Sequence, residues 1–169
     1  QLGELAKNDG AIPGIPTGIA ELDNTIMGLN NSDLILLASR PGVGKTSFAL
    51  NIALSAAKSS GKTVAMFNLE MSKEQLVMRL LSSEAFVDSK KLKTGRLSQE
   101  DWRRIAAAAA SLSKTGIMID DNSMITVSEM NAQCRRIENL GLIIIDYLQL
   151  MQSGSRAENR QQAVSEISR

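Results

Sequence analysis

The sequence predicts an α/β fold in which a mostly parallel sheet is flanked by helices. Short apolar segments bounded by turn-forming residues alternate with longer segments whose apolar residues recur at helical spacing. A glycine-rich loop joins the first apolar segment to the first long helical segment, in the strand–loop–helix order of a parallel β–α unit. Together these two observations favour a sheet whose strands are connected through helices packed on its faces.

The predicted strands are short and rich in branched aliphatic residues. Residues 34–38 read Leu-Ile-Leu-Leu-Ala, and a continuous apolar run between turn signals predicts a strand buried on both faces. The second strand follows a Ser-Ser-Gly helix stop. The strands are predicted at residues 34–38, 63–69, 117–119 and 142–145.

Most of the predicted helices begin at capping sequences. A serine or threonine followed three residues later by an acidic or amide side chain can satisfy two backbone N–H groups of a first helical turn. Such pairs are Ser72 with Gln75, Ser98 with Asp101, and Thr126 with Glu129. The helices are predicted at residues 46–58, 72–85, 102–112 and 126–138.

The chain is expected to form one domain. Its 169 residues are enough for a sizeable core, and no internal repeat divides them. Residues 1–12 are polar and contain glycine, so they are predicted to be a linker arm, with the domain at residues 13–169. Residues 154–169 read as a polar loop entering a helix, and no strand follows. We therefore expect the chain to be the N-terminal part of a domain that is truncated at its C-terminus.

Composition excludes several kinds of chemistry. The chain contains no histidine and one cysteine, Cys134, which rules out a disulfide framework, a Cys/His zinc site and an imidazole base. Cys134 is expected to fill space beside the core. The net charge of +1 indicates no global attraction to nucleic acid. No apolar run approaches the roughly 18 residues of a membrane span, so we expect a cytoplasmic protein without a membrane partner.

The glycine-rich loop has the pattern that binds nucleotide phosphates. Backbone N–H groups at a helix N-terminus attract a polyphosphate, and Gly42 and Gly44 permit the tight backbone that aims them inward. Lys45 is predicted to reach the β- and γ-phosphates, and the Thr46 hydroxyl to ligate Mg²⁺. Ser39 stands where the usual pattern has its first glycine. The predicted nucleotide-binding residues are Ser39, Arg40, Pro41, Gly42, Val43, Gly44, Lys45, Thr46 and Ser47.

Acidic residues follow three of the predicted strands. Asp146 comes directly after the run Leu-Ile-Ile-Ile, and there it is predicted to hold Mg²⁺ beside the phosphate loop. Glu70 is a candidate for orienting the attacking water, although an acid before a helix can equally serve only the helix dipole. Asp120 and Asp121 offer either a metal site or a solvated turn, and the turn is favoured because Thr46 and Asp146 already supply one Mg²⁺ site.

The motifs favour ATP as the fuel of a motor over two other uses of a phosphate loop. A small GTPase would carry a guanine-specific Asn-Lys-x-Asp element, which the sequence lacks. A small-molecule kinase would carry an arginine-rich lid between later strands, and no such lid is evident.

Two further motifs are far more specific than the phosphate loop: Asn-Leu-Glu-Met-Ser at residues 68–72 and Asp-Tyr-Leu-Gln-Leu at residues 146–150. With them, residues 12–169 resemble the C-terminal ATPase domain of bacterial replicative DNA helicases of the DnaB type. The matching stretches are residues 14–18, 21–23, 38–46, 48–52, 68–72, 75–79, 97–102, 119–121, 134–136, 145–150, 158–162 and 165–169.

The resemblance implies a RecA-like core, homo-hexameric rings, and ATP bound between subunits. It further implies translocation on single-stranded DNA, unwinding at the replication fork, and primase and a helicase loader as partners. Under it, Glu70 aligns with the catalytic glutamate, with Lys45 also catalytic, and Asp146 aligns with the aspartate that holds Mg²⁺. The alternative is a RecA-like protein whose ATP state gates assembly or recombination without unwinding.

The family's domain extends further than this sequence. It continues past Arg169 into a glutamine that senses the γ-phosphate, an arginine finger and DNA-contacting loops. We therefore expect weak ATP hydrolysis, or none, from these 169 residues alone.

Overall fold

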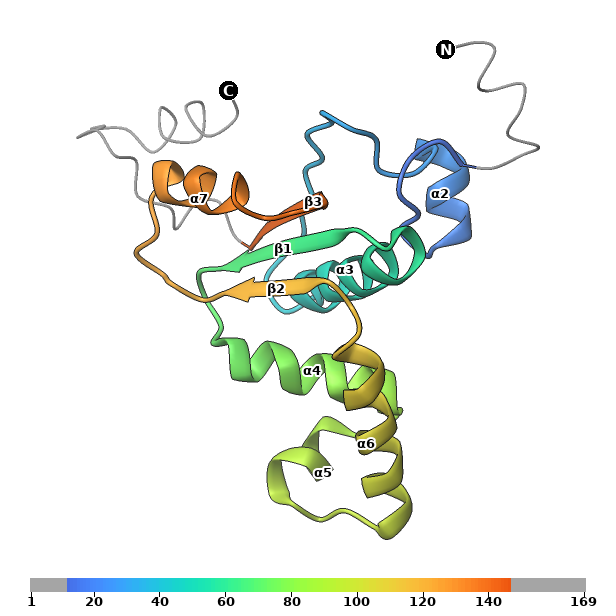
Figure 1. Ribbon diagram of the computed structural model, residues 1–169. Helices are drawn as coiled ribbons and strands as arrows, with labels where there is room; N and C mark the ends of the chain where they lie inside the picture. The colour runs from blue at the N-terminus through green and yellow to red at the C-terminus, as the bar shows by residue number, and fades with distance from the viewer. Residues whose placement is uncertain (1–11, 147–169) are drawn as a thin grey trace.

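A parallel sheet forms the centre of the computed structural model, which describes residues 12–146. Its strands are β1 (Thr63–Asn68), β2 (Ile117–Asp120) and β3 (Leu140–Asp146), in the spatial order β2-β1-β3. Both neighbours of β1 run parallel to it. Parallel strands need crossover connections, and helices supply them here, which confirms the α/β fold class (Figure 1).

The helices form layers on the sheet and a projection beside it. Figure 1 shows α3 and α7 on opposite faces of the sheet, while α4, α5 and α6 extend away from it. The described helices are α2 (Ala20–Ile26), α3 (Lys45–Ser60), α4 (Lys73–Ala85), α5 (Ser89–Thr94), α6 (Gln99–Leu112) and α7 (Val127–Cys134).

The central strand β1 contributes alternate side chains to the two faces of the sheet. Val64 and Met66 pack on the α3 face, and Met66 there contacts a cluster that includes Leu50 of α3. Ala65 and Phe67 pack on the other face in a cluster with α7. All four of these strand residues are at most 2% exposed. This two-residue alternation with both faces covered explains why residues 64–67 of β1 are all apolar.

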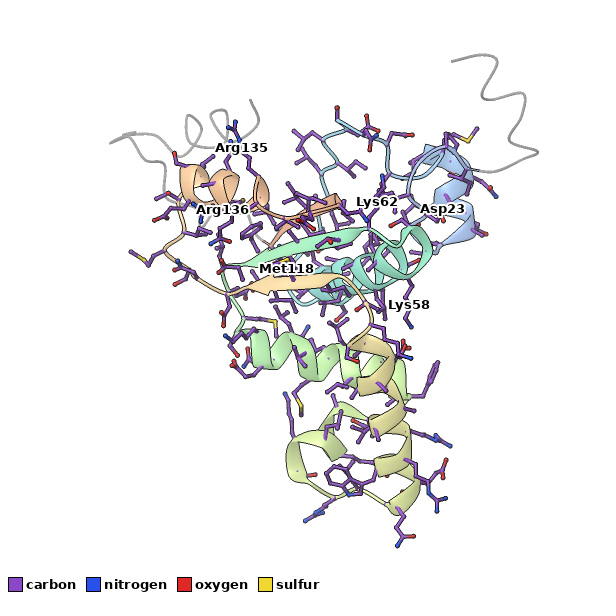
Figure 2. The ribbon with its side chains drawn as sticks, in the orientation of Figure 1. Asp23, Lys58, Lys62, Met118, Arg135 and Arg136 are labelled. Carbon is purple, nitrogen blue, oxygen red and sulfur yellow. The ribbon has the colours of Figure 1, made fainter. Side chains whose placement is uncertain are left out.

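The projecting helices have a small core of their own. Ala85 and Val87, at and after the end of α4, cluster with Ala108 of α6. An ion pair between Lys58 of α3, labelled in Figure 2, and Glu84 of α4 ties this part to the sheet layer. The Lys58 ammonium lowers the pKa of Glu84, and Ser111 of α6 also donates a hydrogen bond to that carboxylate.

Asp23 of α2, labelled in Figure 2, fixes the turn that precedes its own helix. Its Oδ1 accepts hydrogen bonds from the backbone N–H and the hydroxyl of Thr17, both at 2.7 Å, and its Oδ2 accepts one from the N–H of Gly18 at 3.1 Å. Asp23 is 4% exposed and Thr17 2% exposed. Burial would raise the pKa of Asp23, but these hydrogen bonds outweigh it and lower the pKa below its usual range.

The predicted strand at residues 34–38 is wrong. These residues have no regular structure, and Leu34, Ile35, Leu36 and Leu37 are 67%, 52%, 78% and 44% exposed. A buried strand needs a neighbour to hydrogen-bond with, and the described sheet pairs β3 with β1 alone. An apolar run indicates that a segment can be buried, but it does not provide the second strand.

Other predicted boundaries differ less. The helix predicted at residues 126–138 ends at Cys134, because the chain turns there before β3. The short helix α5 was not predicted, since its lysine-rich sequence has no apolar periodicity. Capping boxes at Ser98 and Thr126 are confirmed, and Ser72 caps α4 by accepting a hydrogen bond from the N–H of Gln75. The predicted polar loop and helix at residues 154–169 lie outside the described residues.

Candidate functional site

The phosphate loop leads directly into α3, which begins at Lys45. Gly42 and Gly44 have φ values of +79° and +105°, in the left-handed region that other residues rarely adopt. A side chain at either position would meet no atom within 4 Å, so backbone conformation, and not space, requires these glycines. The turn closes with a hydrogen bond from the N–H of Val43 to the carbonyl oxygen of Arg40.

The first turn of α3 is suited to an anion. Gly44 is its N-cap residue, so no side chain caps the helix, and no acidic residue lies in the first turn. A 16-residue helix carries a partial positive charge at this end, where its N–H groups point outward. The loop residues 39–44 are exposed. The uncapped N–H groups of this turn can therefore accept the phosphates of a nucleotide.

Asp146, the last residue of β3, is the centre of the site. It is 3% exposed, and side chains from two elements converge on its carboxylate. The Lys45 Nζ lies 2.9 Å from Oδ1, and the Thr46 hydroxyl donates a hydrogen bond of 2.6 Å to Oδ2. The structure therefore brings together three predicted residues, although 100 positions separate Thr46 from Asp146 in the sequence.

The same carboxylate has a third partner that the sequence did not predict. Asn68, at the end of β1, donates a hydrogen bond of 3.1 Å from Nδ2 to Asp146 Oδ2. The two residues are paired in register across β1 and β3, which puts their side chains at the same edge of the sheet. The sequence signal that could have indicated Asn68 is a polar residue that ends an apolar strand, two positions before Glu70.

Glu70 lies in the turn that leaves β1. Its side chain is exposed, and its backbone N–H donates a hydrogen bond of 3.0 Å to Asn68 Oδ1. The next N–H, of Met71, donates to the same oxygen at 2.6 Å. The turn thus presents the Glu70 carboxylate to solvent at the carboxyl edge of the sheet, where the phosphate loop also lies.

A second cation approaches the start of α3. Arg79 of α4 donates a hydrogen bond of 3.4 Å from Nη1 to the Ser47 hydroxyl. Ser47 directly follows Lys45 and Thr46, so this contact places a guanidinium beside the first turn of the helix. An anion bound there would meet positive charge from the lysine, the arginine and the helix end.

The other strand-end acids have partners of their own. Asp121 Oδ2 accepts a hydrogen bond from the N–H of Lys73 at the start of α4, and Asp120 Oδ1 accepts one from the N–H of Asn122. Each carboxylate therefore organises a turn or a helix start. Within residues 12–146, no group of three or more His, Cys, Asp or Glu residues is arranged to hold a metal ion.

Cys134 is half-buried against the apolar cluster beside α7, as expected for a residue that fills space. Burial raises the pKa of its thiol.

Every helix described between residues 12 and 146 is too short or too polar to span a membrane.

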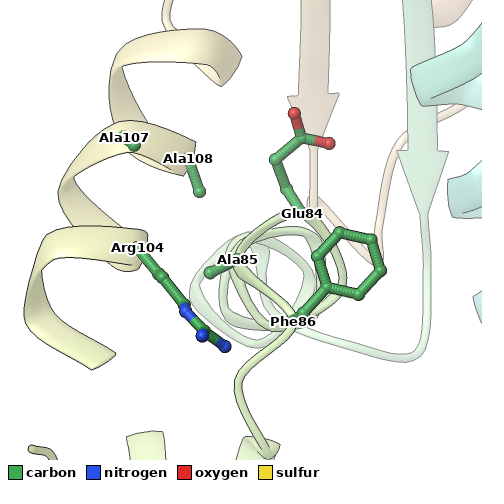
Figure 3. A pocket seen from close by; sticks show the side chains of 6 residues that line it. All are labelled: Glu84, Ala85, Phe86, Arg104, Ala107 and Ala108. Atoms are coloured by element: carbon green, nitrogen blue, oxygen red, sulfur yellow. The ribbon is translucent and has the colours of Figure 1, made fainter. Parts of the chain in front are cut away.

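The protein surface also has a pocket away from the phosphate loop. Figure 3 shows this pocket between the end of α4 and α6. Alanines form much of its lining, and Phe86, which is 88% exposed, stands at its side. No residue of the phosphate loop contributes to it. Its lining residues are Glu84, Ala85, Phe86, Arg104, Ala107 and Ala108.

The residues present suit Mg²⁺ and a nucleoside triphosphate. A hydroxyl oxygen and a carboxylate oxygen, here 2.6 Å apart, are hard donors of the kind that Mg²⁺ prefers, and Mg²⁺ usually takes its other ligands from waters and phosphates. The glycine loop, the uncapped helix end and Lys45 suit a polyphosphate. Thr46 and Asp146 are therefore the residues that would hold the metal.

Comparison with known proteins gives a consistent result. Residues 14–169 match the family described as DnaB-like helicase C terminal domain. The chain is 54% identical over 169 residues to the replicative DNA helicase DnaB of Geobacillus stearothermophilus. It is 52% identical over 170 residues to the replicative DNA helicase DnaC of Bacillus subtilis. These alignments cover 98% of this chain but only 37% of each relative.

Solved structures show the same similarity. One that is described as an ATPase domain superposes with a TM-score of 0.89 at 29% identity, covering 98% of this chain and 61% of that one. A DnaB-like replicative helicase, described together with its interactions with primase, superposes with a TM-score of 0.88 at 29% identity. That match covers 98% of this chain and 42% of the helicase.

Proposed function

This chain belongs to the DnaB-like helicase C terminal domain family, and we propose that it is the nucleotide-binding core of an ATP-driven replicative DNA helicase. The observation that carries the proposal is the convergence of Lys45 and Thr46 on the buried Asp146 carboxylate beside a glycine loop. The chain spans 37% of the length of the named relatives, so we propose the helicase activity for a protein that contains this domain. The domain we propose occupies residues 13–169, with residues 1–12 as a linker arm.

Each residue of the site has a distinct proposed role. The backbone of the loop from Ser39 to Ser47 binds the phosphates, and Lys45 exchanges its Asp146 partner for β- and γ-phosphate oxygens. Thr46 and Asp146 would hold Mg²⁺, and the ion would neutralise charge on those phosphates.

Glu70 is the proposed catalytic carboxylate. It orients a water so that the water oxygen attacks the γ-phosphorus while the bond to the β–γ bridging oxygen breaks, giving ADP and inorganic phosphate. The water's proton passes to the Glu70 carboxylate or to a phosphate oxygen. The exposure of Glu70 at the carboxyl edge of the sheet supports this role, because the attacking water must reach it.

The proposed partners follow from the family. We propose that the full protein assembles as a homo-hexameric ring, translocates on single-stranded DNA and works in the cytoplasm with primase and a loader. The structure of a similar helicase with primase interactions supports the primase part. The alternative remains an ATP-gated assembly or recombination protein, and displacement of a strand from forked DNA by the full-length protein distinguishes the two. Persistent ATP turnover without strand displacement would favour the alternative.

Binding can be tested on the 169-residue chain itself. Titration calorimetry with Mg-ATP is expected to show binding that Lys45→Ala weakens at least about tenfold, because a charge-assisted phosphate contact contributes about 1.5–3 kcal/mol. Lys114→Ala removes the same charge from an exposed turn after α6 and serves as the control. Equal affinities for wild type and Lys45→Ala would contradict the proposed site.

Catalysis is tested on the full-length protein. Glu70→Gln is expected to keep Mg-ATP affinity but to lower DNA-stimulated turnover by about 10²–10⁴-fold, the usual contribution of a positioned acid or base. Glu74→Gln, an exposed residue in the first turn of α4, is the matched control. Unchanged turnover in Glu70→Gln would remove Glu70 from the mechanism while leaving the binding site intact.

A further inference from the structure

Asn68 connects the two carboxylates of the proposed site. Its amide nitrogen donates to Asp146 Oδ2 at 3.1 Å, and its amide oxygen accepts from the backbone N–H groups of Glu70 and Met71 at 3.0 and 2.6 Å. Asn68 is 1% exposed. One rigid, planar group therefore links the aspartate at the end of β3 to the turn that carries Glu70.

The surrounding chemistry dictates which way the amide faces. Two N–H donors converge on one end, and only the carbonyl oxygen can accept them. A carboxylate lies at the other end, and only the NH₂ group can donate to it. A side chain with a single kind of polar atom could not satisfy both ends, so asparagine is chemically specified here.

The backbone alone leaves this connection incomplete. The Leu69 N–H donates a 2.8 Å hydrogen bond to the Asp146 carbonyl oxygen, which extends the pairing of β1 and β3 by one residue. That bond fixes the main chains but neither the Asp146 carboxylate nor the turn at Glu70. The Asn68 side chain adds both restraints from a buried position.

We infer that Asn68 is a positioning residue that sets the Glu70 turn relative to Asp146, the residue proposed to hold Mg²⁺. This inference rests on the proposed function. The Asn68 amide atoms are hydrogen-bonded to Asp146 and to the Glu70 turn, so we assign the residue no direct contact with nucleotide or metal. Its removal is therefore expected to lower kcat and to change the Mg²⁺ dependence, while Mg-ATP affinity changes little. Loss of an outer partner of a metal ligand typically costs 10–100-fold in activity or metal affinity.

Two substitutions separate the halves of the connection in the full-length protein. Asn68→Asp keeps an oxygen for the N–H groups of Glu70 and Met71 but sets a second carboxylate against Asp146. Asn68→Ala removes both halves. We expect kcat for ATP to fall about 10–100-fold in both variants, with KM within about threefold of wild type. In Asn68→Asp the half-saturating Mg²⁺ concentration is also expected to shift, because the metal-holding carboxylate gains a like charge beside it.

A matched control is Asn51→Ala. Asn51 is an exposed asparagine of α3 that also links two elements, by accepting a hydrogen bond from the Ser83 hydroxyl of α4. It should leave kcat and the Mg²⁺ dependence unchanged. Thermal melting of every variant establishes whether it is folded.

The outcomes are distinguishable. Folded Asn68 variants with wild-type kcat overturn the positioning role, and so does a loss confined to KM. If Asn68→Ala does not fold, Asn68→Asp decides by the same criteria, and failure of both to fold makes Asn68 purely structural, which also overturns the inference. If wild type itself does not hydrolyse ATP, or Lys45→Ala hydrolyses it normally, the proposed function fails instead.

Discussion

At the scale of single residues, Asp23 stabilises the described start of the chain through three hydrogen bonds to Thr17 and Gly18. Asp23→Ala would leave buried donors without an acceptor, and such groups cost their full desolvation penalty. We expect the free energy of unfolding to fall by about 2–3 kcal/mol, measured by urea denaturation. Asn24→Ala, on the exposed side of the same helix, should change it by less than about 0.5 kcal/mol. Similar losses from both substitutions would count against this role.

The charge of Asp23 also makes its contribution depend on pH. Its pKa is lowered in the folded protein, so its stabilising effect is complete above the unfolded pKa of about 3.9 and is lost as pH falls through the folded value. We therefore expect the difference in unfolding free energy between wild type and Asp23→Ala to be constant from pH 7 to about pH 5 and to shrink below about pH 4. Denaturation curves at several pH values measure this difference. A difference that grows as the pH falls would contradict the prediction.

The site residues differ in how far the sequence alone identifies them. Lys45 and Thr46 belong to a continuous loop pattern, and Asp146 ends an apolar run, so local sequence was enough to predict that they meet. Asn68 was missed because it belongs to no phosphate-binding or metal-binding pattern, and a polar residue at a strand end does not by itself indicate a partner 78 positions away. The chemical roles of Glu70 and Lys45 stay predictions until turnover is measured.

At the scale of elements, the capping box at Ser98 fixes the start of α6. The Ser98 hydroxyl accepts a hydrogen bond from the N–H of Asp101, and the Asp101 carboxylate accepts one from the N–H of Ser98, which lowers the Asp101 pKa. Ser98→Ala is expected to lower the free energy of unfolding by about 1 kcal/mol, the typical cost of losing an N-cap. Chemical denaturation measures it, with Ser123→Ala in an exposed turn as the control. Equal free energies of unfolding for Ser98→Ala and Ser123→Ala would show that the cap does not stabilise the fold.

The starts of the helices could be predicted from the sequence, and can be tested one at a time, because each cap is a local feature. A cap joins residues three positions apart, so its hydrogen bonds can be inferred from a short segment, as at Thr126 and Glu129. The end of α7 at Cys134 and the strand predicted at residues 34–38 depend on distant parts of the fold. The order β2-β1-β3 likewise follows from packing between elements, and sequence patterns predicted only that the strands would be parallel.

Two features of the described surface of the molecule favour association: an exposed apolar segment, residues 34–37, and a sheet edge without a partner among the described strands. Leu34 and Leu36 are 67% and 78% exposed, and β3 pairs with β1 on one side only among the described strands. Exposed apolar segments of high β-propensity and unpaired sheet edges both promote association between chains. The segment directly precedes the phosphate loop, so its state also affects the backbone that presents Lys45.

We therefore expect the 169-residue chain to self-associate in a concentration-dependent way. Replacing Leu34 and Leu36 together by lysine puts charge on the segment, and like charges on an edge oppose pairing between copies. Sedimentation velocity over a range of concentrations should show a smaller average mass for this double variant than for wild type. Val77→Lys adds charge at an isolated, 42% exposed position of α4 and should leave association nearly unchanged. A wild-type chain that stays monomeric throughout, or a Val77→Lys effect as large as that of the double variant, would show that residues 34–37 do not drive association.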